Sequence, residues 1–183
     1  MKIITGTPGT GKHTVAKILA RSLGLELVDI SRMAMSEGMC EKSGGALEVD
    51  VSRLKRAIDS KVPRGALLVG HLAPYVVSRK NVEAAVVLRR SPYKLAQVYR
   101  KRGYAKKKAA ANLGSEILGV TYYDALKNFG GKKTFQLDTT CRTPDETARR
   151  IKSVLAGRRP REDRVDWLAE ITRKKDLARF FPY

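Results

Sequence analysis

The sequence has few cysteines, few aromatic residues and no long apolar run. Its two cysteines, Cys40 and Cys141, are too few for a disulfide framework and lack the spacing of a metal site. No apolar run approaches the roughly 18 residues of a membrane-spanning helix, so we expect no membrane contact. The N-terminal residues are expected to form the first strand, and we therefore expect no signal peptide. These features predict a cytoplasmic protein, or a nuclear one if the source is a eukaryote.

Acidic residues are also scarce. The 183 residues contain 18 Asp and Glu against 37 Lys and Arg, which gives a formal net charge of +19. A site for one nucleotide needs only a few cations, so the excess predicts a second, polyanionic partner, for which RNA is the natural candidate. Aromatic residues make up only 7% of the chain, which favours contact with RNA phosphates over base stacking. The alternative is a basic surface that contacts only solvent.

One motif dominates what the sequence does contain. Residues 6–14 read Gly-Thr-Pro-Gly-Thr-Gly-Lys-His-Thr, between a short apolar stretch and a segment with helical apolar spacing. Such a turn points several backbone N–H groups inward, and with the positive end of the following helix they form a cradle for phosphate. Gly9 and Gly11 let the backbone approach a polyphosphate, and Lys12 supplies charge to its β- and γ-phosphates. The motif predicts binding of a nucleoside triphosphate, because a chance glycine-rich turn would not fit both flanks.

The residue after the lysine departs from the commonest form of this motif. A Ser or Thr usually stands there and binds Mg²⁺ directly, whereas this chain has His13 followed by Thr14. Neutral imidazole is a poor ligand for a hard cation. Adenylate kinases resemble this chain in having a residue that does not bind the metal there, followed by Thr, with Mg²⁺ held largely through water. We therefore expect ATP and Mg²⁺ at this loop, with no residue as a direct metal ligand.

Five short apolar stretches are typical of parallel strands that are covered on both faces. They are Ile3–Thr5, Leu25–Ile30, Ala66–Val69, Ala84–Leu88 and Phe135–Leu137. Helical stretches lie between them, so the sequence predicts an α/β fold of three layers, a five-stranded parallel sheet with helices on both faces. The clearest helix start is Thr143-Pro144-Asp145-Glu146, where Thr143 is the N-cap and Glu146 closes a capping box.

The chain length fits one domain over residues 1–183, with two insertions and an extension. Residues 31–49 are expected to form a polar insertion of helix and loop after the second strand, and residues 101–111 a basic lid after the fourth. Both follow the carboxyl ends of strands, where open α/β sheets bind ligands. A nucleotide kinase needs two such flaps, one for the phosphoryl acceptor and one that closes over the transferred group. Residues 158–183 form a basic extension with one expected amphipathic helix, marked by Val165, Leu168, Ile171 and Leu177.

Together these motifs resemble the adenylate kinase isoenzyme 6-like family, atypical nucleotide kinases of archaea and eukaryotes implicated in maturation of the small ribosomal subunit. The resemblance covers roughly residues 1–156 and implies a nucleoside-monophosphate-kinase-like P-loop fold with a lid and a monophosphate-binding insertion. Its marks are the loop at residues 6–12, Leu47-Glu48-Val49-Asp50 with Arg53-Leu54, Gly70-His71, Leu88-Arg89, and Arg102-Gly103-Tyr104 with Lys107, Asn112 and Glu116. The last set is not a general feature of P-loop proteins.

The resemblance implies roles for individual residues. The ATP phosphates are held by residues of the loop and the lid, namely Gly9, Gly11, Lys12, His13, Thr14 and Arg102. The transferring phosphoryl group needs positioned cations, which the resemblance assigns to Lys12, Arg102 and Arg89. His71 is linked to the water around the metal and to hydrolysis. The alternatives are surface charge for the two arginines and a structural histidine for His71.

The acceptor side is implied by the same resemblance. Ser31 and Arg32 begin the insertion and Asp50 opens the helix beside the acceptor, although Asp50 would serve equally as a plain helix N-cap. Three positions depart from the family's pattern: Val69 replaces an acid that orients magnesium-bound water, Met35 replaces an arginine for the acceptor phosphate, and Val98 replaces an arginine before the lid. Arg32 could substitute for the missing acceptor arginine.

Two functions stay open at this stage. The first is Mg²⁺-dependent transfer of the ATP γ-phosphoryl group to AMP or another nucleoside monophosphate, with associated ATPase activity, in maturation of 16S- or 18S-type rRNA. The second is an assembly switch whose ATP hydrolysis controls its grip on a small-subunit ribosomal protein and rRNA, with little kinase activity. The high positive charge, Met35 and His71 favour the second. A nucleotide-free RNA scaffold does not fit the intact loop.

Overall fold

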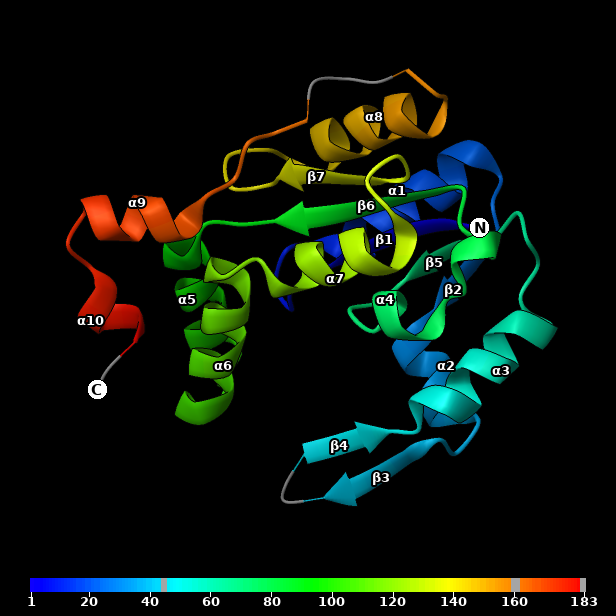
Figure 1. Cartoon of the computed structure of the whole chain (residues 1–183), viewed down its shortest axis with the longest axis horizontal. Coiled ribbons are helices and arrows are strands. Elements are labelled where there is room, and N and C mark those ends of the chain that lie inside the picture. Colours follow the sequence, from blue (N-terminus) through cyan, green and yellow to red (C-terminus); the bar gives the residue numbers. More distant parts are fainter. Residues whose placement is uncertain (44–45, 159–161, 182–183) are drawn as a thin grey trace.

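A five-stranded parallel sheet forms the centre of the computed structural model, which describes residues 1–43, 46–158 and 162–181 (Figure 1). Its strands are β1 Lys2–Gly6, β2 Leu27–Asp29, β5 Leu67–Val69, β6 Ala84–Arg89 and β7 Thr134–Asp138. Their order is β2-β5-β1-β6-β7, and every neighbouring pair is parallel. Each strand overlaps one of the five predicted apolar stretches, so the predicted α/β fold is confirmed.

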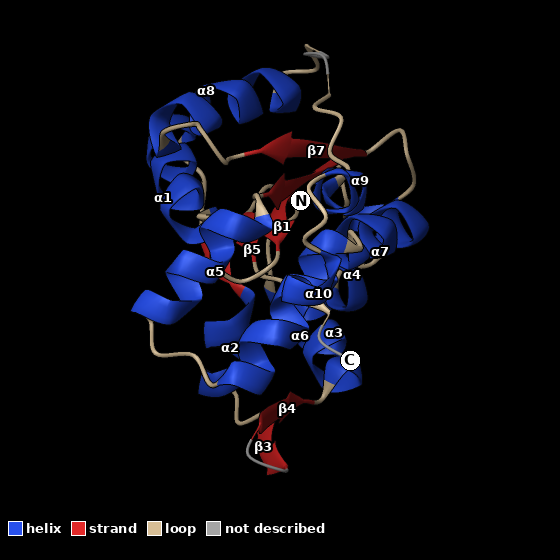
Figure 2. Cartoon of the chain, turned by 90° about the vertical axis from the view of Figure 1, so that its left-hand side faces the viewer, coloured by secondary structure: helices blue, strands red, loops and turns tan. Residues whose placement is uncertain are grey.

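Helices cover both faces of the sheet, as Figure 2 shows. One face carries α1 Lys12–Leu23 and α8 Pro144–Leu155, and the other carries α3 Val51–Lys61, α4 Ala73–Val76 and α7 Val120–Phe129. The adjacent residues Ile3 and Ile4 of β1 are both fully buried but belong to opposite layers of the core. This alternation follows from the two-residue period of a strand, and it explains why the strands read as continuous apolar runs.

Local signals fix the ends of the two helices on the first face. Helix α1 begins after Gly11 and ends at Gly24, which both have positive φ angles. Helix α8 begins at the predicted capping box, where Thr143 Oγ1 accepts the N–H of Glu146 and a Glu146 oxygen accepts the N–H of Thr143. Both predicted helix starts are therefore confirmed.

The insertion at residues 31–49 differs in part from its prediction. Helix α2 Ile30–Ser36 is followed by an antiparallel hairpin of β3 Cys40–Ser43 and β4 Ala46–Val49, where a loop was expected. The sequence hides these strands because each is only four residues long. The signal that could have revealed them is the Gly44-Gly45 pair, a typical hairpin turn, which lies outside the described residues.

The lid and the C-terminal extension pack against each other. The predicted lid, residues 101–111, spans the end of α5 Pro92–Lys101 and the start of α6 Lys106–Ile117; we call these two helices the lid segment and α6 the lid helix. Helices α9 Trp167–Arg173 and α10 Leu177–Phe180 lie beside α6 in Figure 1. The prediction of one amphipathic helix in the extension is wrong, because Leu168 and Leu177 are exposed. The buried side chains are Trp167, Ile171 and Phe180, which share a small apolar core with Ile117 and Leu113 of α6.

A short α4 and a 3-10 turn, Arg79–Asn81, connect β5 to β6. In the described part of the chain, no helix is both long and apolar enough to cross a membrane.

Candidate active site

The phosphate loop lies between β1 and α1, at residues 7–11. Gly9 has φ +93°, and a Cβ there would lie 2.9 Å from Cδ2 of Leu95 in α5. Gly11 has φ +90° and faces open space, so the backbone angle alone requires glycine. The two predicted glycines therefore serve different purposes: Gly9 lets the loop pass close under the lid segment, and Gly11 turns it into α1.

Side chains from distant segments hold the carbonyl groups of this loop. Tyr99 donates its hydroxyl to the carbonyl of Pro8 at 2.6 Å. Arg90 Nη1 donates to the carbonyl of Gly9 at 3.1 Å, and Thr139 Oγ1 donates to that of Thr10 at 3.1 Å. Carbonyl groups held from outside do not point into the loop, which leaves backbone N–H groups to receive an anion. The sequence did not reveal these three anchors, because they come from three separate segments.

Lys12 lies deep in the site, with 5% of its surface exposed. Its burial, together with the positive charge of Arg102, lowers the pKa of Lys12 to about 8, while Asp29 and Glu116 act in the opposite direction. The charged form of a buried lysine next to a second cation is unfavourable when no anion is bound, and a bound anion stabilises it. The pair is therefore suited to bind phosphate.

His13 and Thr14 follow in the first turn of α1, and both are exposed. His13 Nε2 lies 3.2 Å from Oδ2 of Asp29 at the end of β2. The His13 side chain is 48% exposed. Its partial burial and the charge of Lys12 lower the pKa of His13 below its usual value, although Asp29 opposes them, which favours the neutral imidazole. No group of three or more His, Cys, Asp or Glu side chains among the described residues could form a metal cage.

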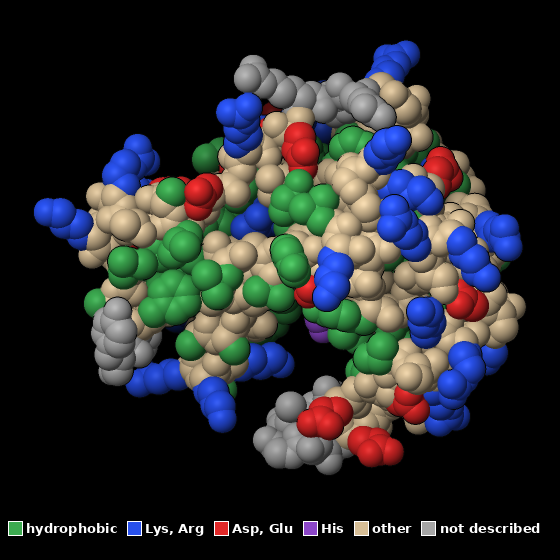
Figure 3. All heavy atoms as spheres, in the orientation of Figure 1, with side chains coloured by type: hydrophobic (Ala, Val, Ile, Leu, Met, Phe, Trp, Pro, Cys, Tyr) green, Lys and Arg blue, Asp and Glu red, His purple; other side chains and the backbone are tan. Residues whose placement is uncertain are grey.

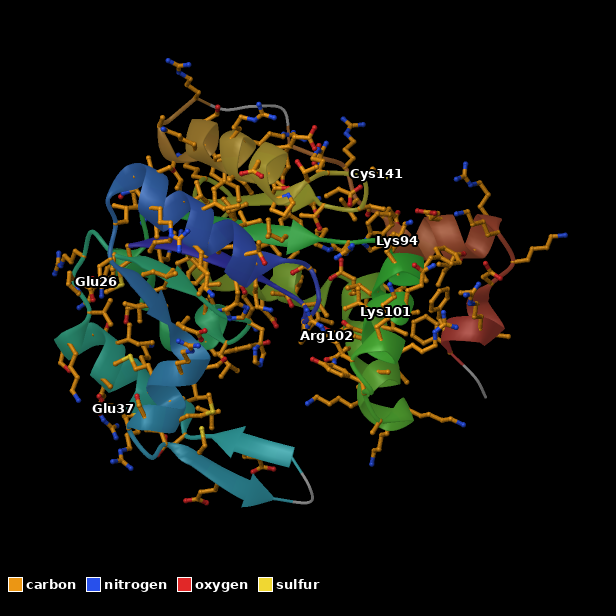
Figure 4. The ribbon with its side chains drawn as sticks, turned by 180° about the vertical axis from the view of Figure 1, so that it is seen from behind. Glu26, Glu37, Lys94, Lys101, Arg102 and Cys141 are labelled. Carbon is orange, nitrogen blue, oxygen red and sulfur yellow. The ribbon has the colours of Figure 1, made fainter. Side chains whose placement is uncertain are left out.

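The lid residue Arg102 ends α5 and is exposed beside the phosphate loop, as Figure 4 shows. Tyr104 follows it and stacks on Tyr99, with ring centroids 5.0 Å apart and planes 6° apart. Lys108 Nζ lies 5.1 Å from the centre of the Tyr104 ring. Because Tyr99 also holds Pro8, the stacked rings join the start of the lid helix to the phosphate loop.

Arg89, which was predicted to reach the transferring phosphoryl group, forms a buried ion pair with Glu116. The residue is 3% exposed, and its Nε and Nη2 donate to the side chain and the carbonyl of Glu116 at 2.8 and 2.7 Å. Its Nη1 donates to Gln136 at 3.1 Å. Every nitrogen of the guanidinium thus has a protein acceptor, which favours a structural role for Arg89 over the predicted contact with the phosphoryl group. Arg89 instead holds the end of β6 to the end of α6, and its neighbour Arg90 is the arginine that reaches the loop.

His71 lies within electrostatic reach of both sides of the site. Loss of surrounding water lowers the pKa of His71, and the positive charges of Lys12, His13 and Lys108 lower it further. Lys12 and His13 belong to α1 and Lys108 belongs to α6, so His71 feels the positive charge of both helices. Figure 3 shows a hollow in the molecule between the β3–β4 hairpin and helix α6.

The predicted acceptor residues lie at two helix starts. Ser31 and Arg32 are in the first turn of α2 and donate their backbone N–H groups to Asp29 at 3.0 and 3.2 Å. Asp50 caps α3 by accepting the N–H of Arg53 at 2.9 Å. Met35, one turn further along α2, is 56% exposed. Asp50 therefore acts as a helix N-cap, which was the alternative to an acceptor role. The side chain of Arg32 is exposed.

A groove of about 690 Å³ runs along the outer side of α1. His13 and Thr14 line one end of it, and the next two turns of the helix line the rest. It therefore opens directly beside the phosphate loop.

Comparison with known proteins shows which family the chain resembles. Residues 3–119 match the family described as "AAA domain". A protein of Thermococcus onnurineus strain NA1 named "Putative adenylate kinase" is 34% identical over 169 residues, 91% of this chain and 91% of that protein. One of the same name from Halobacterium salinarum is 33% identical over 168 residues, 90% of this chain and 95% of its own. A gluconokinase structure from Sinorhizobium meliloti 1021 covers 85% of this chain and 91% of its own, with a TM-score of 0.58 and 20% identity, which shows a shared fold.

Proposed function

The chain belongs to the nucleotide-kinase family of the archaeal proteins named "Putative adenylate kinase", and from this premise we propose that it transfers the γ-phosphoryl group of ATP to AMP. The γ-phosphorus would leave the bridging oxygen of ATP and bond to a phosphate oxygen of AMP, which yields two molecules of ADP. The observation that carries the proposal is Lys12, which is buried at the start of α1, directly after the phosphate loop, and feels the charge of Arg102.

Each side of the site has a task in this reaction. The loop and Lys12 would hold the β- and γ-phosphates, and Arg102 would approach the phosphoryl group as negative charge spreads over its oxygens. Ser31, Arg32 and Asp50 begin the helices beside the acceptor position, where Arg32 supplies a cation in place of the arginine missing at Met35. Arg89 would act only through Glu116, by fixing the end of β6 and the lid.

Mg²⁺ supplies positive charge to the phosphates when it is bound. Thr14 has a hydroxyl in the first turn of α1, and Asp29 has a carboxylate next to His13. These groups fit a cation that keeps much of its water, because they offer isolated oxygen atoms and no cage. His71 would act on the same water, in the role that the family resemblance implies.

The preferred acceptor is tested by a panel of AMP, CMP, GMP and UMP at equal concentration, with products separated by ion-exchange chromatography. The proposal expects AMP to give the fastest formation of its diphosphate. Formation of no diphosphate from any of the four would contradict a nucleotide kinase. A faster reaction with another monophosphate would support a nucleotide kinase whose preferred acceptor is that monophosphate instead of AMP.

A second candidate function is favoured by the formal charge of +19. In this proposal the protein is of the adenylate kinase isoenzyme 6-like type, and slow ATP hydrolysis controls its binding to a small-subunit ribosomal protein and to rRNA, in the cytoplasm or, in a eukaryote, the nucleus. Kinase and switch can coexist on one site. If the switch dominates, phosphate release should rise when small-subunit RNA is added and should not depend on AMP.

A further inference from the structure

We infer that Asp29 orients the water molecules of the Mg²⁺ ion that accompanies bound nucleotide. The inference rests on the proposed function, because it needs a nucleotide in the phosphate loop. P-loop NTPases commonly hold this ion with a Ser or Thr after the lysine and with an acid from a second segment. In this chain His13 follows the lysine, and β5, which lies next to β1, ends at Val69. Both of the usual oxygen groups are therefore replaced.

Asp29 lies directly beside the position where β5 lacks an acid. Strands β2 and β5 are parallel, and Asp29 is the Cα partner of Val69 in their register. The two residues thus stand at the same carboxyl edge of the sheet, the edge at which open α/β sheets bind ligands. The other described strand that ends in an acid is β7, at the opposite end of the sheet, where Asp138 accepts the N–H of Thr140.

The two carboxylate oxygens of Asp29 have different partners. Oδ1 accepts the N–H groups of Ser31 and Arg32 and so caps α2. Oδ2 lies 3.2 Å from Nε2 of His13, and 22% of the side chain is exposed. A carboxylate has about four acceptor positions, so three hydrogen bonds leave one for water. The cap explains Oδ1 alone, whereas the position of Oδ2 brings negative charge to the first turn of α1.

The electrostatics of the site single out the same residue. Burial and Arg102 lower the pKa of Lys12 to about 8, and the two acids that oppose them are Asp29 and Glu116. Glu116 is 1% exposed and is already hydrogen-bonded to Arg89, Arg90 and Trp167. Of these two acids, Asp29 is therefore the one that can reach a metal-bound water.

His13 takes a supporting part in this arrangement. Neutral imidazole is a poor magnesium ligand, but its Nε2–H can fix the orientation of a carboxylate. His13 would hold Oδ2 of Asp29 beside the phosphate loop, in the way that outer-shell partners orient the groups around a metal.

The test measures the dissociation constant of ADP by isothermal titration calorimetry, once with Mg²⁺ and once with EDTA. Asp29→Asn removes the charge and keeps a side-chain oxygen that caps a helix. We expect this variant to bind ADP normally in EDTA and to lose tenfold or more of the affinity gained with Mg²⁺, within the range of about 10- to 100-fold found for outer-shell changes. The readout does not depend on turnover.

Asp166→Asn is the matched control, because Asp166 caps α9 through the N–H of Ala169 at 2.9 Å. It should keep the Mg²⁺ gain of the unmodified chain, which is the increase in ADP affinity when Mg²⁺ replaces EDTA. If Asp29→Asn does not fold, as judged by circular dichroism, Asp29→Ser provides another uncharged cap. The inference is overturned if the Asp29 variant keeps the full Mg²⁺ gain, or if the control loses as much. Failure of the proposed function would look different, since an unmodified chain that hydrolyses ATP and transfers nothing to AMP would still bind ADP and would still bind it more tightly with Mg²⁺.

Discussion

Trp167 donates its indole N–H to Oε1 of Glu116 at 3.0 Å and so joins the C-terminal extension to the lid helix. The same oxygen accepts Nε of Arg89 at 2.8 Å and the backbone N–H of Arg90 at 3.0 Å. Arg90 in turn donates to the carbonyl of Gly9 in the phosphate loop. One buried carboxylate therefore connects the extension, the end of β6, the lid and, through Arg90, the loop that receives the phosphates.

The first prediction concerns this carboxylate. Glu116→Gln removes its charge and leaves the buried Arg89 without a counter-ion, so we expect a loss of about 3–5 kcal/mol in the free energy of unfolding. Urea denaturation measures it. Glu170→Gln is the control, because Glu170 pairs with Lys174 one helical turn away at the surface, where such pairs contribute about 0.3–0.5 kcal/mol. Equal losses of unfolding free energy in the two variants would show that burial does not increase the contribution of the Arg89–Glu116 pair to stability.

The second prediction is a pH dependence of ADP binding. The pKa of Lys12 is lowered to about 8 by burial and Arg102, so the lysine loses its charge as the pH rises through this value. ADP affinity should be level below about pH 8 and fall by up to tenfold per pH unit above it. Lys12→Arg stays charged over this range, and its ADP affinity should not fall. A fall of the same size in the arginine variant would assign the titration to another group.

The third prediction separates binding from transfer. Arg102→Ala should lower kcat by about 100-fold or more and change ATP affinity little, because the lid arginine acts on charge that develops during transfer. Steady-state kinetics with independent measurement of ATP binding gives both values. Lys101→Ala is the control, as the preceding residue of α5 and exposed like Arg102. Loss of ATP affinity with kcat preserved would contradict the assignment of Arg102 to the transferring group.

The fourth prediction concerns RNA. If the excess of positive charge binds RNA phosphates, the affinity for a single-stranded fragment of small-subunit rRNA should fall steeply between about 50 and 200 mM salt. Fluorescence anisotropy at several salt concentrations measures the slope. Affinity that does not change with salt would mean that the charge excess is not a phosphate-binding surface.

The sequence predicted those parts of the fold that depend on neighbouring residues. The loop around Lys12, the capping box at Thr143 and the five strands each carry their signal within a few residues, and the structure has all of them. The hairpin after α2 was missed because its two strands, of four residues each, are too short to show alternation. In the extension, the apolar positions fitted one helix, but burial of Trp167 and Phe180 requires two short ones.

The contacts of the site were harder to predict because they join distant segments. Arg89 ends a strand close to the loop, so its sequence position gives no sign that it pairs with Glu116, 27 residues later. Arg90 and Tyr99 reach the loop from 81 and 91 residues away. Asp29 was overlooked for a simpler reason: an acid at a strand end reads as a helix cap, and its register with Val69 exists only in the folded sheet.

The most direct test of the central claim is ATP turnover with Mg²⁺, in which ADP and free phosphate are measured separately with and without AMP, and Lys12→Ala gives the background. The account predicts that ADP forms without free phosphate and only when AMP is present. Release of phosphate at the same rate with or without AMP would contradict phosphoryl transfer to a nucleotide and would identify the site as a hydrolase.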